Sequence, residues 1–91
     1  MSKQITVLIV DDDVTNRLIL RTLIKETGYL SIEAENGQQA VDACLNNHID
    51  IVLMDVMMPI MDGYKSAQLI KAKSRTFIPI IFLTALADEK S

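Results

Sequence analysis

Short apolar runs alternate along the chain with segments in which apolar residues recur every three or four positions. Such runs are typical of strands buried in a parallel sheet, and the longer spacing is typical of amphipathic helices. The predicted strands are Ile5–Val10, Ser31–Ala34, Ile51–Met54 and Pro79–Leu83. The predicted helices are Val14–Thr27, Gln38–Leu45 and Tyr64–Lys73, and Thr84–Lys90 is predicted to be a loop that enters a fourth helix.

The helical spacing also predicts which face of each helix is buried. Gly28 is placed to end the first helix, and Asn36 with Gly37 turns the chain into the second. The predicted buried stripe of the first helix is Ile19, Leu20, Leu23 and Ile24. That of the second helix is Ala40, Val41, Cys44 and Leu45, so we expect Cys44 to be a small buried apolar residue.

Strands that alternate with helices predict a parallel sheet covered on both faces. Right-handed crossovers then produce an open, doubly wound α/β sheet, whose ligands bind at the carboxyl ends of the strands. Four polar residues stand at these ends: Asp11, Asp12, Asp55 and Thr84. We therefore expect their side chains to lie at one end of the sheet.

Composition narrows the classes of protein to consider. The 91 residues are enough for one small domain, and their net charge of −3 argues against direct contact with nucleic acid. The single cysteine, Cys44, excludes an internal disulfide and fits a reducing compartment. No apolar stretch approaches the ~20 residues of a membrane helix, and the N-terminal residues lack a signal-peptide pattern. We expect a cytoplasmic protein.

The sequence ends at Ser91, where the fourth helix is expected to begin. The strand Pro79–Leu83 would then form an edge of the sheet, and an apolar edge strand pairs readily with another chain. We expect that a helix and a fifth strand are missing from this chain, or that something else covers the edge. A homodimer formed through this strand is one such arrangement.

The acidic residues at the predicted strand ends indicate a site for chemistry. Carboxylates brought together are unfavourable unless a hard cation neutralises them or one of them stays protonated. We interpret Asp55 as a nucleophile and the pair Asp11 and Asp12 as the seat of a Mg²⁺ ion. Asp13 comes at the start of the loop and is expected to be a solvated helix cap. The methionines around Asp55 are expected to fill core and loop, because thioethers are poor ligands for a hard cation.

Four motifs in this order resemble the receiver domain of two-component response regulators. They are Val7–Asp12, Ala34–Gly37, Leu53–Gly63 and Ile80–Ala85, and together they cover essentially the whole chain. The resemblance implies a flavodoxin-like doubly wound parallel sheet of order 2-1-3-4, with the fifth strand and last helix missing from this chain. Residues 1–91 would be one receiver domain that is incomplete at its C-terminus.

The resemblance also implies roles for individual residues. Asp55 would accept a phosphoryl group from a phosphohistidine of a sensor histidine kinase or a histidine phosphotransfer protein. Asp12 and Asp55 would bind Mg²⁺ directly, Asp11 would act through a water molecule, and the backbone carbonyl of Met57 would complete the shell. Thr84 would donate a hydrogen bond to a phosphoryl oxygen. Such a domain catalyses its own phosphorylation and is not a conventional turnover enzyme.

The family pattern contains two further residues, a lysine after the fifth strand and an aromatic residue on that strand. The sequence to Ser91 includes neither, and Lys90 is not assigned the role of that lysine. We also expect a surface for docking a kinase on the first helix, formed by Val14, Arg17, Leu18 and Arg21. His48 lies in a polar loop and has no paired acid or cysteine in the sequence pattern.

Two other functions fit parts of the sequence. Asp11–Thr15 matches the Asp-x-Asp-x-Thr motif of haloacid-dehalogenase-like phosphohydrolases, in which Asp11 would be the nucleophile and Asp13 the acid and base. That interpretation gives Asp55 no role and leaves Asp62 with Gly63 unexplained. The second alternative is a truncated interaction module that dimerises through Pro79–Leu83 without phosphoryl chemistry.

Overall fold

The computed structural model describes residues 4–56 and 61–83. Within these residues, four strands alternate with three helices. They are β1 (Thr6–Val10), α1 (Val14–Glu26), β2 (Leu30–Ala34), α2 (Gly37–Asn46), β3 (Ile51–Asp55), α3 (Gly63–Lys73) and β4 (Ile80–Leu83). Each element predicted within the described residues is confirmed. The predicted bounds differ from these by no more than one residue at either end.

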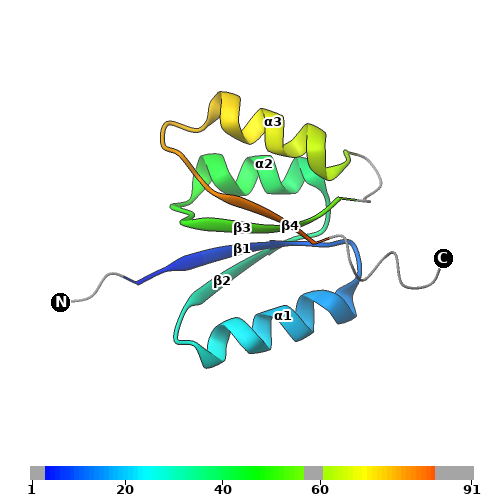
Figure 1. The fold of residues 1–91 in the computed structure, drawn as a ribbon, viewed down its shortest axis with the longest axis vertical. Helices are drawn as coiled ribbons and strands as arrows, with labels where there is room; N and C mark the ends of the chain where they lie inside the picture. Colours follow the sequence, from blue (N-terminus) through cyan, green and yellow to red (C-terminus); the bar gives the residue numbers. More distant parts are fainter. Residues whose placement is uncertain (1–3, 57–60, 84–91) are drawn as a thin grey trace.

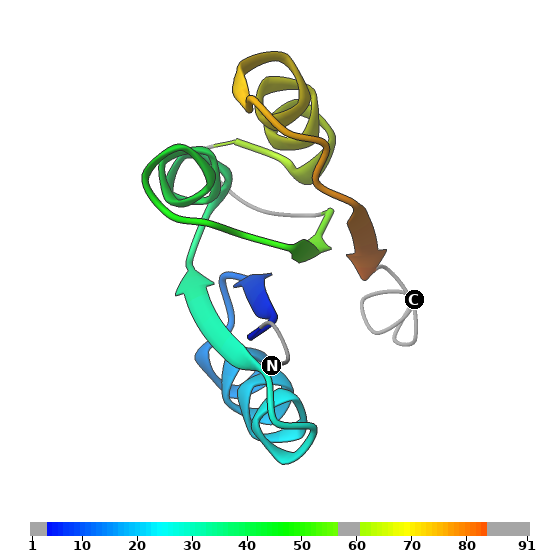
Figure 2. The ribbon, with the colours of Figure 1, turned by 90° about the vertical axis from the view of Figure 1, so that its left-hand side faces the viewer.

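The four strands form one parallel sheet in the order β2-β1-β3-β4. The helix α1 covers one face of the sheet, and α2 and α3 cover the other (Figures 1 and 2). This arrangement confirms the predicted doubly wound fold and its strand order. Among the described residues β4 pairs with β3 alone and forms one edge of the sheet. The predicted start of a fourth helix, residues 84–90, lies outside the described residues.

The larger part of the core lies between the sheet and the helices α2 and α3. Alternate residues of β1 divide between the two faces, as the pleat of a strand requires. Leu8 and Val10 pack with Met54 and Ile70 on the α2 and α3 face. Val7 and Ile9 pack with Ile24 of α1 on the other face. All these side chains are buried, so both faces of the central strand are covered.

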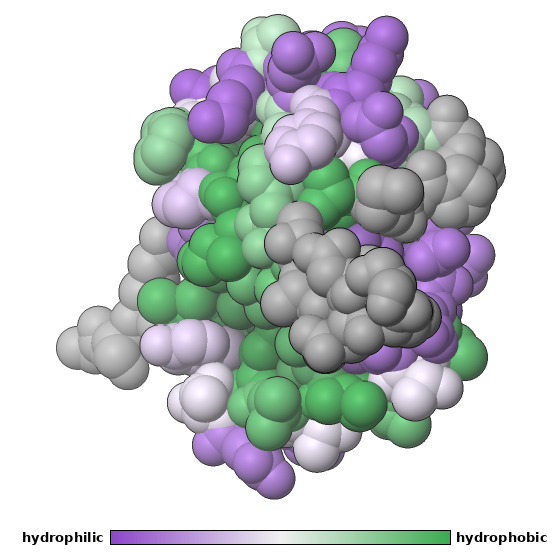
Figure 3. Space-filling model, turned by 45° about the vertical axis from the view of Figure 1, so that its right-hand side comes forward, coloured by the Kyte–Doolittle hydropathy of each residue, from purple (hydrophilic) through white to green (hydrophobic). Residues whose placement is uncertain are grey.

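The predicted burial of α1 is only partly correct. Ile24 is buried, but Ile19 and Leu23 are 53% and 54% exposed. The helix packs on β1 and β2, and no other described helix lies on that face of the sheet (Figure 2). Hydrophobic side chains accordingly gather on one face of the molecule, which includes its lower part where α1 lies (Figure 3). Helical spacing therefore identified an apolar face that the described residues cover only in part.

Side-chain caps fix where the helices begin. The carboxylate of Asp13 accepts a hydrogen bond from the backbone N–H of Thr15 at 2.8 Å, which confirms its predicted role as an exposed cap of α1. Asn36 and Asp62 cap α2 and α3 in the same way. The helix α1 ends before Gly28, whose φ of +89° suits glycine. In the described part of the chain, no helix is long and apolar enough to cross a membrane.

Candidate functional site

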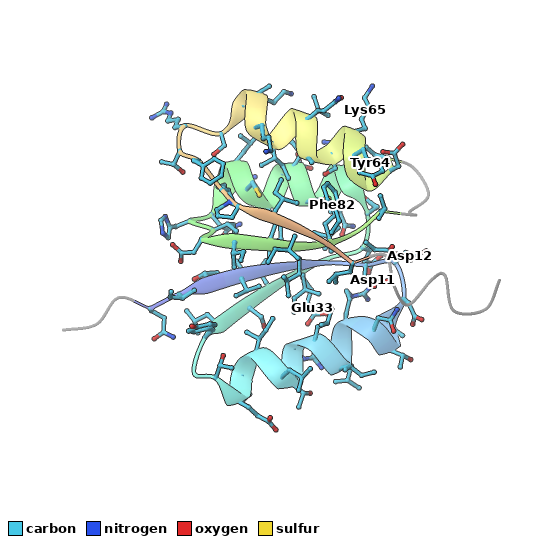
Figure 4. The ribbon with its side chains drawn as sticks, in the orientation of Figure 1. Asp11, Asp12, Glu33, Tyr64, Lys65 and Phe82 are labelled. Carbon is cyan, nitrogen blue, oxygen red and sulfur yellow. The ribbon has the colours of Figure 1, made fainter. Side chains whose placement is uncertain are left out.

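Three aspartates meet at the carboxyl ends of β1 and β3. The two strands end side by side, because Val10 of β1 pairs in register with Met54 of β3. Asp11 and Asp12 follow β1 (Figure 4), and Asp55 is the last residue of β3. One carboxylate oxygen from each of the three lies within 4.8 Å of the others. The predicted meeting of Asp11, Asp12 and Asp55 is therefore what the structure shows.

The three carboxylates differ in their surroundings. Asp11 is buried, Asp55 is half-buried and Asp12 is exposed. One carboxylate oxygen of Asp11 accepts the backbone N–H of Asp13 at 2.9 Å, and the other accepts the side-chain amide of Asn16 at 3.3 Å. Asp11 is thus held in place from α1, whereas the exposed Asp12 faces solvent.

Burial is the main cause that raises the pKa of Asp11 above its ordinary value. The hydrogen bonds from Asp13 and Asn16 act in the opposite direction, and the nearby charges of Asp12 and Asp13 raise the pKa further. A cation placed beside Asp11 would favour its charged form. The site therefore has the electrostatic character expected of a cation-binding cluster.

A close approach of α3 shapes the backbone beside Asp55. The N–H of Gly63 donates to the carbonyl oxygen of Val56 at 2.9 Å. A Cβ atom at position 63 would lie 2.7 Å from the backbone oxygen of Asp55 and 2.8 Å from the Cα atom of Val56. Only glycine fits such a contact. The close approach of α3 to the backbone of Asp55 therefore explains why a glycine follows Asp62 in the sequence.

Two of the predicted site residues cannot be compared with the structure. Thr84 and Met57 lie outside the described residues, so the roles implied for them stay predictions. The end of β4 does lie beside the site, since Leu83 pairs with Asp55. Next to it, the rings of Tyr64 and Phe82 contact each other with centroids 4.9 Å apart and join the start of α3 to β4 (Figure 4).

Asn16 and Arg17 were missed as site residues by the sequence-based interpretation. Arg17 was expected on an exposed docking surface, but it is only 9% exposed and donates to the backbone oxygen of Asp11 at 2.7 Å. Val14 and Leu18 are exposed, as that surface requires. The sequence did contain one feature that could have identified them. The cap at Asp13 places Asn16 and Arg17 in the first turn of α1, beside the end of β1.

The end of the sheet opposite the three aspartates carries a histidine and a cysteine, His48 and Cys44. His48 lies 3.0 Å from the carboxylate of Asp50, which corrects the expectation that it has no acidic partner. Cys44 is buried as predicted, and burial raises the pKa of its thiol to about 11. Both line a cavity of about 500 Å³ at the ends of α2 and α3. The exposed Leu45 also lines it, although the sequence predicted that residue to be buried.

Comparison with known proteins identifies the family. A family model for the response regulator receiver domain matches residues 7–91. The chain belongs to this family. The receiver domain is therefore the family that the motifs predicted, rather than the phosphohydrolase family of the alternative interpretation.

Related receiver domains occur in sensor kinases and in response regulators. The autoinducer 1 sensor kinase/phosphatase LuxN of Vibrio campbellii is 40% identical over 85 residues, which are 93% of this chain. The chain spans only 10% of the length of LuxN. The receiver domain described here is thus comparable to a small part of that relative.

Two solved structures are informative for the site. The receiver domain of the sensor histidine kinase PA1611 from Pseudomonas aeruginosa was crystallised with magnesium in its active site cleft. It is 31% identical, with a TM-score of 0.85 over 96% of this chain and 72% of that chain. The receiver domain of the response regulator Ssk1, in complex with the histidine phosphotransfer protein Ypd1 of Saccharomyces cerevisiae, is 27% identical. Its TM-score is 0.75 over 92% of this chain and 64% of that chain.

Proposed function

We propose that this receiver domain is a phosphoacceptor of a two-component or phosphorelay pathway. Asp55 receives a phosphoryl group from a phosphohistidine on a sensor histidine kinase or a histidine phosphotransfer protein. The observation that carries the proposal is the meeting of Asp11, Asp12 and Asp55 within 4.8 Å at the ends of β1 and β3. A nucleophile beside a pair of cation ligands is the arrangement that phosphoryl transfer needs.

The donor atoms fit Mg²⁺. All three side chains offer carboxylate oxygens, which are the ligands that this hard cation prefers. One oxygen of each carboxylate lies within 4.8 Å of the others, so the three side chains could hold one ion. As the family resemblance implies, Asp12 and Asp55 would bind it directly and Asp11 would act through water. The magnesium ion in the cleft of the PA1611 receiver domain supports this choice of metal. Met57 would contribute its backbone carbonyl, as the family resemblance implies.

The transfer is a substitution at phosphorus. A carboxylate oxygen of Asp55 forms the new P–O bond and yields an acyl phosphate, while the P–N bond of the phosphohistidine breaks and its electron pair returns to the imidazole ring. The bound Mg²⁺ would neutralise negative charge on the phosphoryl oxygens. Asp11 and Asp12 would hold the metal beside Asp55, and Thr84 would donate a hydrogen bond to a phosphoryl oxygen.

The proposed partner docks beside this site. Val14 and Leu18 are 66% and 49% exposed in the first turns of α1, next to the loop that carries Asp11 and Asp12. Apolar side chains at this place would pack against a helix that presents the phosphohistidine. The complex of the Ssk1 receiver domain with Ypd1 supports a histidine phosphotransfer protein as a partner class.

Intact mass after incubation with acetyl phosphate and Mg²⁺ tests the proposal. We expect one phosphoryl increment on the wild-type chain, because acetyl phosphate donates the same group with acetate as the leaving group. Asp55→Asn is expected to show none. Asp13→Asn is the matched control and is expected to keep the increment, whereas a dehalogenase-like enzyme would lose it. An increment that survives Asp55→Asn contradicts the proposal.

A second candidate role is an interaction module that forms homodimers through β4. It is favoured by the position of β4 at an edge of the described sheet, where Ile81 is 48% exposed. The molecular mass of the protein in solution, measured over a range of concentrations, distinguishes this role from that of a monomeric phosphoacceptor. A dimer that dissociates on dilution and resists Asp55→Asn supports it, and a monomer at all concentrations contradicts it.

A further inference from the structure

Arg17 is a helical arginine that is buried, which is unusual for this residue type. It belongs to α1, yet its side chain is only 11% exposed and reaches the loop after β1. Its Nη1 atom donates a 2.7 Å hydrogen bond to the backbone oxygen of Asp11. The contact is buried and joins residues six positions apart, so it is not part of the regular hydrogen bonding of the helix.

The positive charge of Arg17 is balanced by acidic groups outside the aspartate cluster. Its Nε atom donates to Oε1 of Glu33 at 3.2 Å, and Nη2 lies 3.9 Å from Oε2 of Glu35. The second carboxylate oxygen of Glu33 accepts from Arg21 at 2.7 Å. Glu33 is on β2, between the sheet and α1 (Figure 4). Within the described residues, the polar contacts of Arg17 therefore run to a backbone oxygen and to two glutamates, and none of them uses the carboxylate of Asp11.

This division of contacts is compatible with a cation site at the carboxylates. A guanidinium that paired directly with Asp11 or Asp12 would neutralise a ligand and repel an incoming cation. Here the guanidinium of Arg17 donates to the backbone oxygen of Asp11, and its positive charge is paired with the carboxylate of Glu33. Asp11 is then fixed at several atoms. Its N–H donates to Ala34 at 3.1 Å, and its side chain accepts from Asp13 and Asn16.

We infer that Arg17 is a positioning residue for Mg²⁺ binding, which fixes the Asp11 peptide while Glu33 keeps the arginine charge away from the carboxylates. The inference rests on the proposed function above, because it concerns the same metal site. Groups that hold metal ligands in place commonly change metal affinity by 10-fold to 100-fold when they are altered. Arg17 would act through Asp11 and would not touch the metal itself.

The dissociation constant for Mg²⁺ alone, from the shifts of backbone amide signals during a titration, tests this role. Arg17→Lys keeps the charge but lacks the fork that serves Asp11 and Glu33 together. We expect it to weaken Mg²⁺ binding about 10-fold. Arg21→Lys is the matched control, since Arg21 also pairs with Glu33 and makes no contact with Asp11. It is expected to leave the constant within about twofold, as is usual for an exposed pair.

Glu33→Gln provides an independent variant. It leaves Arg17 in place but removes the charge that holds the guanidinium, so we expect weaker Mg²⁺ binding through Arg17. In the Arg17→Lys background the same change should have little further effect, because both act through one chain of contacts. The free energy of unfolding without Mg²⁺ is measured in parallel, and a purely structural role would lower it while leaving the Mg²⁺ constant unchanged.

The outcomes separate the two levels of inference. If the wild type binds Mg²⁺ and Arg17→Lys and Glu33→Gln both bind it equally well, the role of Arg17 is wrong and the proposed function stands. A wild-type chain that binds no Mg²⁺ overturns both. Weakening by Arg17→Lys that Arg21→Lys does not reproduce, with the non-additive effect of Glu33→Gln, supports the role of Arg17.

Discussion

The strand β3 has an aspartate at each end, and the two have opposite surroundings. Asp50 comes just before the strand, and its two carboxylate oxygens contact the backbone N–H of Thr6 at 2.8 Å and the ring of His48 at 3.0 Å. Asp55 ends the strand, and one of its carboxylate oxygens lies within 4.8 Å of those of two other aspartates. The first carboxylate contacts a backbone N–H and a histidine ring, and two further carboxylates lie near the second.

This contrast fits a structural role for Asp50 and the functional role that we propose for Asp55. The hydrogen bond from the backbone N–H of Thr6 to Asp50 ties β1 to the loop before β3. The carboxylates of Asp11 and Asp12 near Asp55 repel its charge, and a bound cation would offset that repulsion. An aspartate of the second kind contributes to binding and chemistry more than to folding. The following predictions test this difference between the two ends of β3.

The largest expected effect is the response of stability to Mg²⁺. A ligand that binds only the native state at 100 times its dissociation constant raises the free energy of unfolding by about 2.7 kcal/mol. We expect this gain for the wild type and for Asp50→Asn, which leaves the acidic cluster intact. Asp12→Ala is expected to lose it. Thermal unfolding with and without Mg²⁺ measures the gain, and equal gains in Asp12→Ala and the wild type would contradict the metal site.

A smaller effect is expected when the same substitution is made at each end without Mg²⁺. Asp50→Asn removes a charge-assisted hydrogen bond and the pair with His48, and we expect it to lower the free energy of unfolding by about 1 kcal/mol. Asp55→Asn removes one of three neighbouring carboxylate charges, and we expect it to lower that free energy by less than Asp50→Asn does. Urea unfolding in the presence of a chelator compares the two variants. The contrast fails if Asp55→Asn destabilises the chain as much as Asp50→Asn.

The smallest expected effect concerns pH. Burial raises the pKa of Asp11 above 3.8 in the folded chain, so the folded state binds this proton more tightly than the unfolded state. The contribution of Asp11 to stability is therefore fully present below pH 3.8 and is lost as the pH rises through the folded pKa. Without Mg²⁺, Asp11→Asn should gain stability relative to the wild type over this rise. A pH series of urea unfolding measures the difference, and a constant difference would be inconsistent with the raised pKa.

The sequence predicted the fold and the meeting of Asp11, Asp12 and Asp55 because both depend on local patterns. Alternating strand and helix periods determine the layers, and residues after parallel strands gather at one end of the sheet. The sequence did not predict the burial of Arg17. Its position depends on Glu33, which belongs to another strand, and such contacts depend on tertiary packing that no short motif contains.

Helical spacing predicted Ile19 and Leu23 to be buried for a related reason. An apolar residue at helical spacing shows which face of a helix is apolar, but it does not show which neighbour covers that face. Of the described elements, β1 and β2 contact α1, and Ile24 packs with Val7 and Ile9 of β1, whereas Ile19 and Leu23 stay exposed. Exposure is thus a property of the whole arrangement of elements.

The acidic cluster depends on the alignment of β1 with β3, in which Val10 pairs with Met54. A slip of β3 by one residue would move Asp55 by about 3.3 Å along the strand and turn its side chain to the other face of the sheet. Asp11 and Asp12 would then lack their third carboxylate, although the strands would still be hydrogen bonded. Cation binding would therefore show when the central strands reach their native alignment during folding. Molecules that are compact but misaligned would not bind the cation.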